Sequence, residues 1–173
     1  CLFVDTGAHR IMIDTGSGAL GSTANKAFPT VDHTTTVTGQ LASSLRSSGI
    51  EPATVDTVII THAHPDHIGG TLDDRGNPVF ARADYFIAAD EWSFWTSKTA
   101  AQEANPPFVE LALKNPRPVQ DRLMLVEDGD EIVPGITVIA ASGHTPGHIA
   151  LRIQSGNEQL LHLSDTVLHP LHL

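Results

Sequence analysis

Apolar, β-branched runs alternate with segments of helical periodicity along the whole chain. The runs at 2–6 and 10–16, separated by Gly-Ala-His, predict a β-hairpin. Between residues 37 and 48 an apolar residue recurs every four positions before a glycine, which predicts a helix. The run VDTVIIT at 55–61 predicts a buried strand that leads directly into His62. The first third therefore predicts a mixture of strands and helix.

The rest of the chain continues this mixture and becomes richer in strands. Short strands are expected at 78–81 and 85–88, a helix at 90–95, and helix with loop at 97–121. Further strands are expected at 122–127, 136–142, 148–154 and 159–165. Strands outnumber helices and no linker or repeat interrupts them, so we expect one α+β domain over 1–173, with layered sheets and helices outside.

Composition restricts the kinds of partner. The chain has 173 residues, 40% of them hydrophobic and 17% charged, which is ordinary for a soluble globular protein. No apolar run approaches the ~20 residues that span a bilayer, and no signal-peptide pattern is present. A formal charge of −10 argues against binding to nucleic acid backbones. We therefore expect a small-molecule substrate and neither membrane nor nucleic acid as partner, and we favour a cytoplasmic location.

The two ends of the sequence are abrupt. CLFVDT begins inside an expected strand, and SDTVLHPLHL stops without a polar tail. A lipoprotein cut before Cys1 would also begin in this way, but the missing linker favours a fragment cut at both ends. With a single cysteine, no internal disulfide can form.

The stretch ITHAHPDHIGG at 60–70 carries four metal-binding side chains within six positions: His62, His64, Asp66 and His67. Pro65 disfavours helix at the residue before it but suits the first position of a helix. His62 and His64 should therefore project together from an extended segment, while the other two occupy the first helical turn. Imidazole and carboxylate without thiolate suit zinc, and also iron, manganese or cobalt.

Two later stretches place further ligands at strand ends. SGHTPGHIA puts His144 directly after the strand at 136–142, and LLHLSDTVL ends another strand in Asp165. Ligands at the ends of separate strands can converge on one edge of a layered fold, where an aspartate can bridge two ions. His148 should begin the next strand and support the site rather than bind metal.

THAHPDHIGG, then GHTPGH, then SDT, together with the early IDTGSG at 13–18, resemble the metallo-β-lactamase superfamily over the whole chain. The resemblance implies an αββα sandwich with two divalent ions, most simply zinc, at one edge. It implies three ligands for the first ion, two for the second, and one aspartate that bridges the pair. These are His62, His64 and His144 for the first ion, Asp66 and His67 for the second, and Asp165 as the bridge.

One family ligand is missing. The second ion normally takes a further histidine well downstream of the bridging aspartate, but this chain ends eight residues after Asp165. His169 is too close in sequence for that role and is expected to line the site. We therefore interpret the C-terminal part of the domain as missing.

Individual positions indicate a branch of the superfamily. The best-known zinc β-lactamases have cysteine where Asp165 stands, which argues against antibiotic hydrolysis. Acyl-homoserine-lactone lactonases usually have tyrosine where Leu168 stands. Methyl parathion hydrolase-like members look closer, since they share ITHxHPDHxGG, an acidic-aromatic segment like DEWSFW, and VPGI with GHTPGH.

The expected reaction is hydrolysis. Two divalent ions lower the pKa of a bridging water to about 7, and the resulting hydroxide attacks an ester, lactone, thioester or phosphotriester. Asp66 is a candidate proton acceptor as well as a ligand. Trp95, Leu168 and His169 are candidates for contact with an apolar part of the substrate, although Trp95 could equally anchor its helix in the core.

Three alternatives remain open. The chain could be a metal-binding regulator or scaffold without turnover, or a nuclease of the superfamily, although nothing basic supports RNA binding. VDTGA at 4–8 and IDTGSG at 13–18 also mimic aspartic proteases. Two copies on one hairpin cannot face each other as that chemistry requires, and one copy in a homodimer would leave the histidines unexplained. The expected role of Asp14 is to hydrogen-bond near the stretch at 60–70, which is called the metal turn below.

Overall fold

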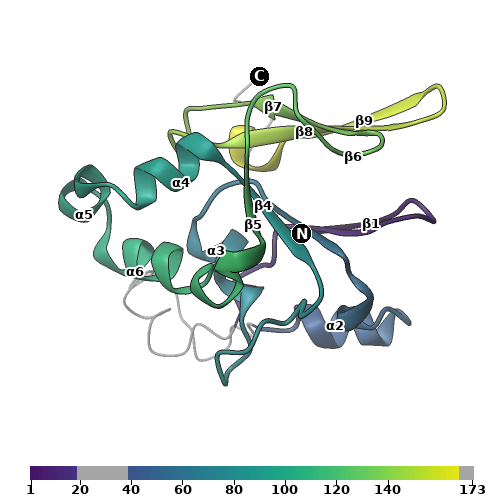
Figure 1. Ribbon diagram of the computed structural model, residues 1–173, viewed down its shortest axis with the longest axis horizontal. Coiled ribbons are helices and arrows are strands. Elements are labelled where there is room, and N and C mark those ends of the chain that lie inside the picture. The colour runs from purple at the N-terminus through teal and green to yellow at the C-terminus, as the bar shows by residue number, and fades with distance from the viewer. Residues whose placement is uncertain (19–38, 168–173) are drawn as a thin grey trace.

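Two β-sheets packed face to face form the centre of the computed structural model, which describes residues 1–18 and 39–167 (Figure 1). In order across the first sheet lie β1 (Leu2–Asp5), β2 (Arg10–Ile13), β3 (Thr57–Ile60), β4 (Asp84–Ala88) and β5 (Leu123–Val126). The second sheet contains β6 (Glu131–Val133), β7 (Ile136–Ala140), β8 (Ile149–Ser155) and β9 (Glu158–His162). Strands β2 to β5 run parallel and β1 antiparallel to β2, while the second sheet is antiparallel throughout.

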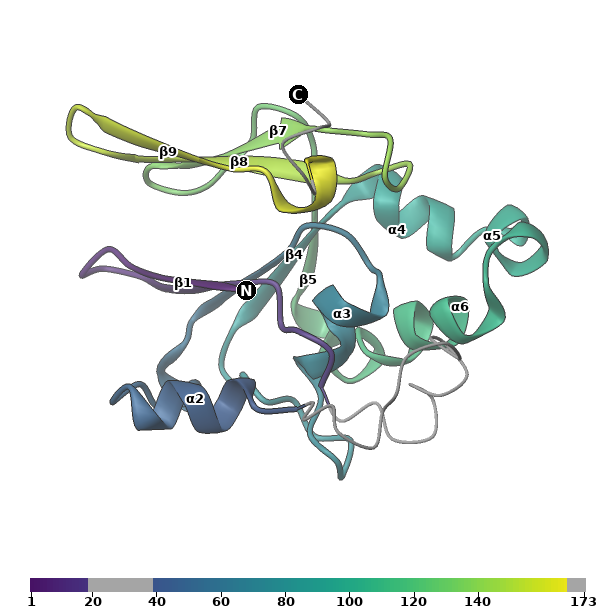
Figure 2. The same ribbon diagram turned by 180° about the vertical axis from the view of Figure 1, so that it is seen from behind.

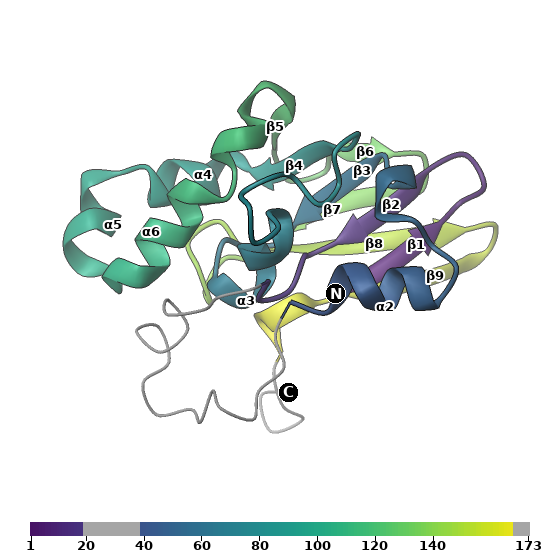
Figure 3. The same cartoon turned by 90° about the horizontal axis from the view of Figure 1, so that it is seen from below.

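Helices cover the face of the first sheet that points away from the second, as the views from behind and below show (Figures 2 and 3). The α-helices are α2 (Leu41–Ser47), α3 (Pro65–Ile68), α4 (Ala89–Trp95), α5 (Lys98–Glu103) and α6 (Pro106–Lys114). Short 3-10 turns are η1 (Pro52–Thr54), η2 (Gly69–Thr71), η3 (Arg117–Arg122) and η4 (Ser164–Thr166). The described residues thus form successive layers of helix, sheet and sheet.

The alternation of side chains along each strand explains why the central strands are apolar throughout. On β3, Ile59 packs between the two sheets, whereas Val58 and Ile60 pack against the helices. On β2, Met12 faces the helices and Ile11 faces the second sheet. Because both faces of the first sheet are covered, its parallel strands lack the apolar–polar alternation of a half-exposed sheet.

Most expected elements are confirmed. The hairpin, the buried strand before His62, the helix at 90–95 and the strands of the C-terminal third are all present, and the α+β class and layered sheets are correct. The helix expected at 37–48 is seen at 41–47, and its first two positions lie outside the described residues.

The strand expected at 78–81 is wrong. Only an isolated bridge between Leu72 and Pro78 is present there. The carbonyl oxygens of Phe80 and Ala81 instead accept hydrogen bonds from the Tyr85 hydroxyl and the Arg122 guanidinium, and the Phe80 side chain is fully buried. Phe80 therefore fills the core from a turn, because side chains satisfy the backbone there.

One strand, β6, was not expected from the sequence. Its three residues precede Pro134 and Gly135, and they pair with β7 through a tight turn. None of the helices in the described ranges is long and apolar enough to cross a membrane.

Candidate metal centre

The carboxyl ends of strands from both sheets meet at one edge of the sandwich. Strand β3 leads into His62 and β7 leads towards His144. The strand expected at 159–165 ends earlier, since β9 stops at His162 and Asp165 lies in η4. The two sheets are joined at this point, since the amide of Ile149 donates to the carbonyl of Thr61 at 3.0 Å. Segments far apart in sequence therefore converge here.

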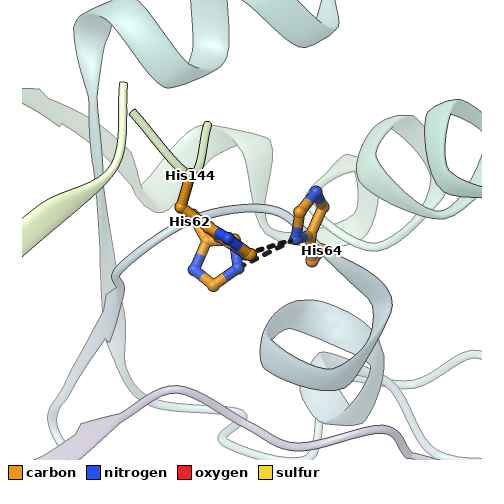
Figure 4. A group of neighbouring side chains, drawn as sticks. All are labelled: His62, His64 and His144. Carbon is orange, nitrogen blue, oxygen red and sulfur yellow. Dashed lines mark hydrogen bonds between the residues drawn. The ribbon is translucent and has the colours of Figure 1, made fainter. Parts of the chain in front are cut away.

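Three imidazoles form the first group: those of His62, His64 and His144 (Figure 4). Nδ1 of His64 lies 3.1 Å from Nε2 of His62 and 3.0 Å from Nε2 of His144. One ring nitrogen carries at most one proton, so His64 Nδ1 cannot donate to both neighbours. A cation shared by the three nitrogens satisfies them better than hydrogen bonds do.

Burial keeps two of these rings neutral. His62 is fully buried, and burial together with the neighbouring imidazoles lowers its pKa far below the usual value. Burial, followed by the nearby His144, also lowers the pKa of His64. Because a neutral imidazole is the form that binds metal, these shifts favour coordination at neutral pH.

A second group contains His62, His67 and Asp165. Oδ2 of Asp165 lies 3.4 Å from Nε2 of His67, 3.4 Å from Nε2 of His144 and 3.9 Å from Nε2 of His62. One carboxylate oxygen therefore lies between His144 of the first group and His67 of the second. This is the position that a ligand shared by two ions would occupy.

Asp14 fixes the orientation of His67. Nδ1 of His67 donates to Oδ2 of Asp14 at 2.9 Å, which turns Nε2 towards Asp165. Burial alone would lower the pKa of His67, but the hydrogen bond to Asp14 and the charges of Asp14, Asp66 and Asp165 together raise it. The expectation that Asp14 would hydrogen-bond near the metal turn is confirmed.

The metal turn has the local structure that Pro65 predicts. His64 is extended (φ −67°, ψ 153°), and α3 begins at Pro65. The chain then passes close to the β2–α2 connection, because a side chain on Gly70 would collide with the carbonyl oxygen of Thr15. Only glycine allows this approach, which places α3 beside the end of β2.

Asp66 lies at the rim. Its side chain is 52% exposed, and Oδ2 is 3.6 Å from Nε2 of His67. It faces the second group without being among the ligand atoms that cluster there in the described residues. Its roles as ligand and proton acceptor stay predictions.

The supporting residue His148 is fully buried, and its Nε2 accepts a hydrogen bond from the Asp165 amide at 3.2 Å. Trp95 is 3% exposed and its ring lies 5.9 Å from that of His64, a place that fits a core anchor, while its contact with substrate stays a prediction. Leu168 and His169 lie outside the described residues.

The donor set fits zinc. Tetrahedral zinc with Zn–N bonds of about 2.0–2.1 Å separates its ligand nitrogens by about 3.3 Å. The spacings of 3.0 and 3.1 Å in the first group are close to that value. Three imidazoles, one further imidazole and a central carboxylate are donors that divalent zinc accepts.

Sequence reasoning missed two parts of the site. Thr61 donates its hydroxyl to Asp14 and lies 2.8 Å from the Ser164 hydroxyl, so it joins three of the converging segments. Glu91 is fully buried behind the histidines. The signal for Glu91 was present in DEWSFW, where an acidic residue occurs in a segment whose helical period buries it together with Trp95.

Comparison with known proteins agrees with this geometry. A sequence model of the metallo-beta-lactamase superfamily matches residues 1–172. An N-acyl homoserine lactonase from Bacillus sp. is 27% identical over 166 residues, which are 90% of this chain and 58% of that protein. The chain thus spans little more than half of the length of that relative.

Solved structures give the same picture. The crystal structure of the hydrolase AbOPH in the beta lactamase superfamily superposes with a TM-score of 0.78 and 31% identity, covering 94% of this chain and 54% of that one. AidC, a dizinc quorum-quenching lactonase in complex with a product, superposes with a TM-score of 0.74 and 28% identity over the same shares.

Proposed function

This chain belongs to the metallo-beta-lactamase superfamily, and on that premise we propose that it forms the metal-binding part of a hydrolase that opens lactones and related esters. The observation that carries the proposal is the place of Asp165. Its Oδ2 is 3.4 Å from Nε2 of His144 and 3.4 Å from Nε2 of His67, as expected for a ligand shared by two ions.

We assign two divalent ions to this edge, with zinc as the metal. His62, His64 and His144 would hold the first ion, and His67 with Asp66 the second, with Asp165 between them. Such a pair of ions, when bound, provides a water of pKa about 7 and polarises the substrate oxygen that becomes negative. The dizinc site of AidC supports this assignment.

The protein's own residues would orient the ligands and manage the protons. Asp14 keeps the Nδ1 proton of His67, so that Nε2 is free to bind metal. Asp66, exposed at the rim, can accept a proton at Oδ2 and pass it to solvent. The aromatic rings of Phe108 and Trp95, 5.3 and 5.9 Å from that of His64, supply an apolar side to the site.

The relatives support a lactone as substrate. An N-acyl homoserine lactonase and the lactonase AidC match most of this chain. Leu168 stands where such lactonases usually carry a tyrosine, and a hydrocarbon side chain cannot donate a hydrogen bond to a ring oxygen. We therefore include open-chain esters, thioesters and phosphotriesters in the substrate class.

The test combines metal analysis with hydrolysis. The purified protein is assayed for zinc content, then against N-hexanoyl homoserine lactone, p-nitrophenyl acetate, a thioester and a phosphotriester, with and without a chelator. We expect bound zinc and chelator-sensitive hydrolysis of the lactone or ester. Bound metal without turnover of any of these by the full-length protein would favour a metal-binding scaffold instead.

A further inference from the structure

The carboxylate of Glu91 is fully buried beside the first histidine group. It has no role in the proposed hydrolysis. It lies in the first turn of α4, which follows β4 directly. Within the described ranges, no Lys, Arg or His side chain forms an ion pair with it. A buried charge is costly unless other groups compensate it, so its hydrogen-bond partners are informative.

Four donors surround the Glu91 carboxylate, two at each oxygen. Oε1 accepts from the amide of Ala63 at 2.8 Å and from the indole Nε1 of Trp95 at 2.7 Å. Oε2 accepts from the hydroxyl of Thr145 at 2.6 Å and from the amide of Gly147 at 3.0 Å. Hydrogen bonds of this kind stabilise the ionised carboxylate, which can only accept.

The donors belong to the two segments that carry the first group of histidines. Ala63 lies between His62 and His64, so one oxygen holds the metal turn. Thr145 directly follows His144, so the other oxygen holds the loop after β7. A single rigid group therefore links both halves of the histidine cluster.

Backbone packing reinforces this link. A side chain on Gly147 would collide with the backbone amide and Cα of Glu91 and with the carbonyl carbon of Asp90. The backbone of the loop therefore lies directly on the start of α4.

We propose that Glu91 is a positioning residue that fixes the distance between the His62–His64 turn and the His144 loop. It thereby sets the affinity of the first histidine group for its metal ion. This inference rests on the proposed metal-dependent function. Glu91 itself binds neither metal nor substrate, and its effect is transmitted through the backbone of Ala63 and through Thr145.

The substitution Glu91→Gln tests this with little change of shape. An amide retains one accepting oxygen, but its NH₂ group meets donors on the other side, so at least one segment loses its anchor. We expect the affinity for the first zinc ion to fall about 10- to 100-fold, the range for residues that orient metal ligands. The affinity for the second ion should stay close to that of the wild type.

Zinc affinities are measured by competition with a chromophoric chelator, and the ligand geometry by the d–d absorption of the cobalt-substituted protein. Tyr85→Phe is the matched control, because it removes one buried hydrogen bond, to the Phe80 carbonyl, from β4, the strand that leads into α4. It should lower the Tm while leaving both affinities and the cobalt spectrum unchanged.

Two further variants carry the test if Glu91→Gln does not fold. Trp95→Phe and Thr145→Val each remove one donor, from opposite oxygens of the Glu91 carboxylate. Each should lower the affinity for the first ion by less than Glu91→Gln does. Wild-type affinities and an unaltered cobalt spectrum in all folded variants would overturn the role of Glu91. Wild-type protein that binds no zinc would overturn the proposed function itself, and this inference with it.

Discussion

Asp14 and His67 are 53 positions apart in sequence and share a hydrogen bond of 2.9 Å between Oδ2 and Nδ1. A carboxylate only accepts, so the proton of a neutral His67 ring lies on Nδ1 and the lone pair of Nε2 points towards Asp165. Asp14 is itself held in place, because the amide and hydroxyl of Thr61 donate to it. Its φ of 58° is unusual for a non-glycine residue and is fixed by these contacts.

Asp14→Asn should lower the affinity for the ion that His67 binds by about 10- to 100-fold. The asparagine NH₂ would face Nδ1 of His67, which must then accept, and the ring proton would move to Nε2, the atom needed for metal. Zinc titration with a competing chelator measures the change.

Asp56→Asn is the matched control for this substitution. Asp56 also faces an imidazole, with Oδ1 3.4 Å from Nδ1 of His9, but it lies at the opposite end of β3 from the metal turn. Its replacement should leave both zinc affinities unchanged. Equal affinities in wild type and Asp14→Asn would contradict an orienting role for Asp14.

Substitution of single ligands should remove the two ions separately. We expect His144→Ala to lose the first ion and His67→Ala to lose the second, because each belongs to one group only. Asp165→Ala should weaken both, since its Oδ2 is 3.4 Å from a nitrogen of each group. Zinc content after gel filtration checks this, and two tightly bound ions in Asp165→Ala would refute the shared position.

The sequence predicted the side chains that the structure brings together better than the residues that support them. His62, His64 and Asp165 follow strand ends, and the turn of a short motif is a local property that spacing and Pro65 determine. DEWSFW indicated that Glu91 is buried, but the partners of Glu91 and Thr61 could not be assigned in this way, because they come from distant segments that meet only after the sheets pack. The strand expected at 78–81 failed for the same reason, since tertiary contacts of Tyr85 and Arg122 bind its carbonyl groups.

Gly70→Ala should destabilise the protein and the metal turn together. The added methyl group would collide with the carbonyl oxygen of Thr15, and backbone on both sides cannot yield easily. We expect a loss of about 1–3 kcal/mol in the free energy of unfolding. Denaturant titration measures it in the metal-free protein.

Gly76→Ala provides the comparison. Gly76 has φ +80°, so alanine is strained there, but nothing lies within 4 Å of the added carbon. This variant should lose only about 1 kcal/mol and keep its zinc affinity. If both variants bound zinc as the wild type does, close packing at Gly70 would not determine the position of the turn.

Acid should destabilise the metal-free protein below about pH 6.5. Burial lowers the pKa of four histidines from the usual value of about 6.5: His62, His64, His148 and His162. In the window just below 6.5 the unfolded chain therefore binds protons at these positions that the folded chain does not, and stability falls as the pH falls. His67 acts in the opposite direction, because its raised pKa stabilises the fold once it is protonated. Four groups outweigh one, and each net proton corresponds to about 1.4 kcal/mol per pH unit.

Urea titrations of the metal-free protein between pH 7 and pH 5, in the presence of a chelator, measure how the free energy of unfolding changes with pH. His148→Asn should reduce this change, because asparagine can still accept from the Asp165 amide but does not titrate. Zinc should restore stability over the upper part of the window, where protons compete weakly for the imidazoles. A stability that stays constant from pH 7 to pH 5 without metal would mean that these histidines are not held neutral by burial. The fit of the site to zinc at neutral pH would then lose its electrostatic basis.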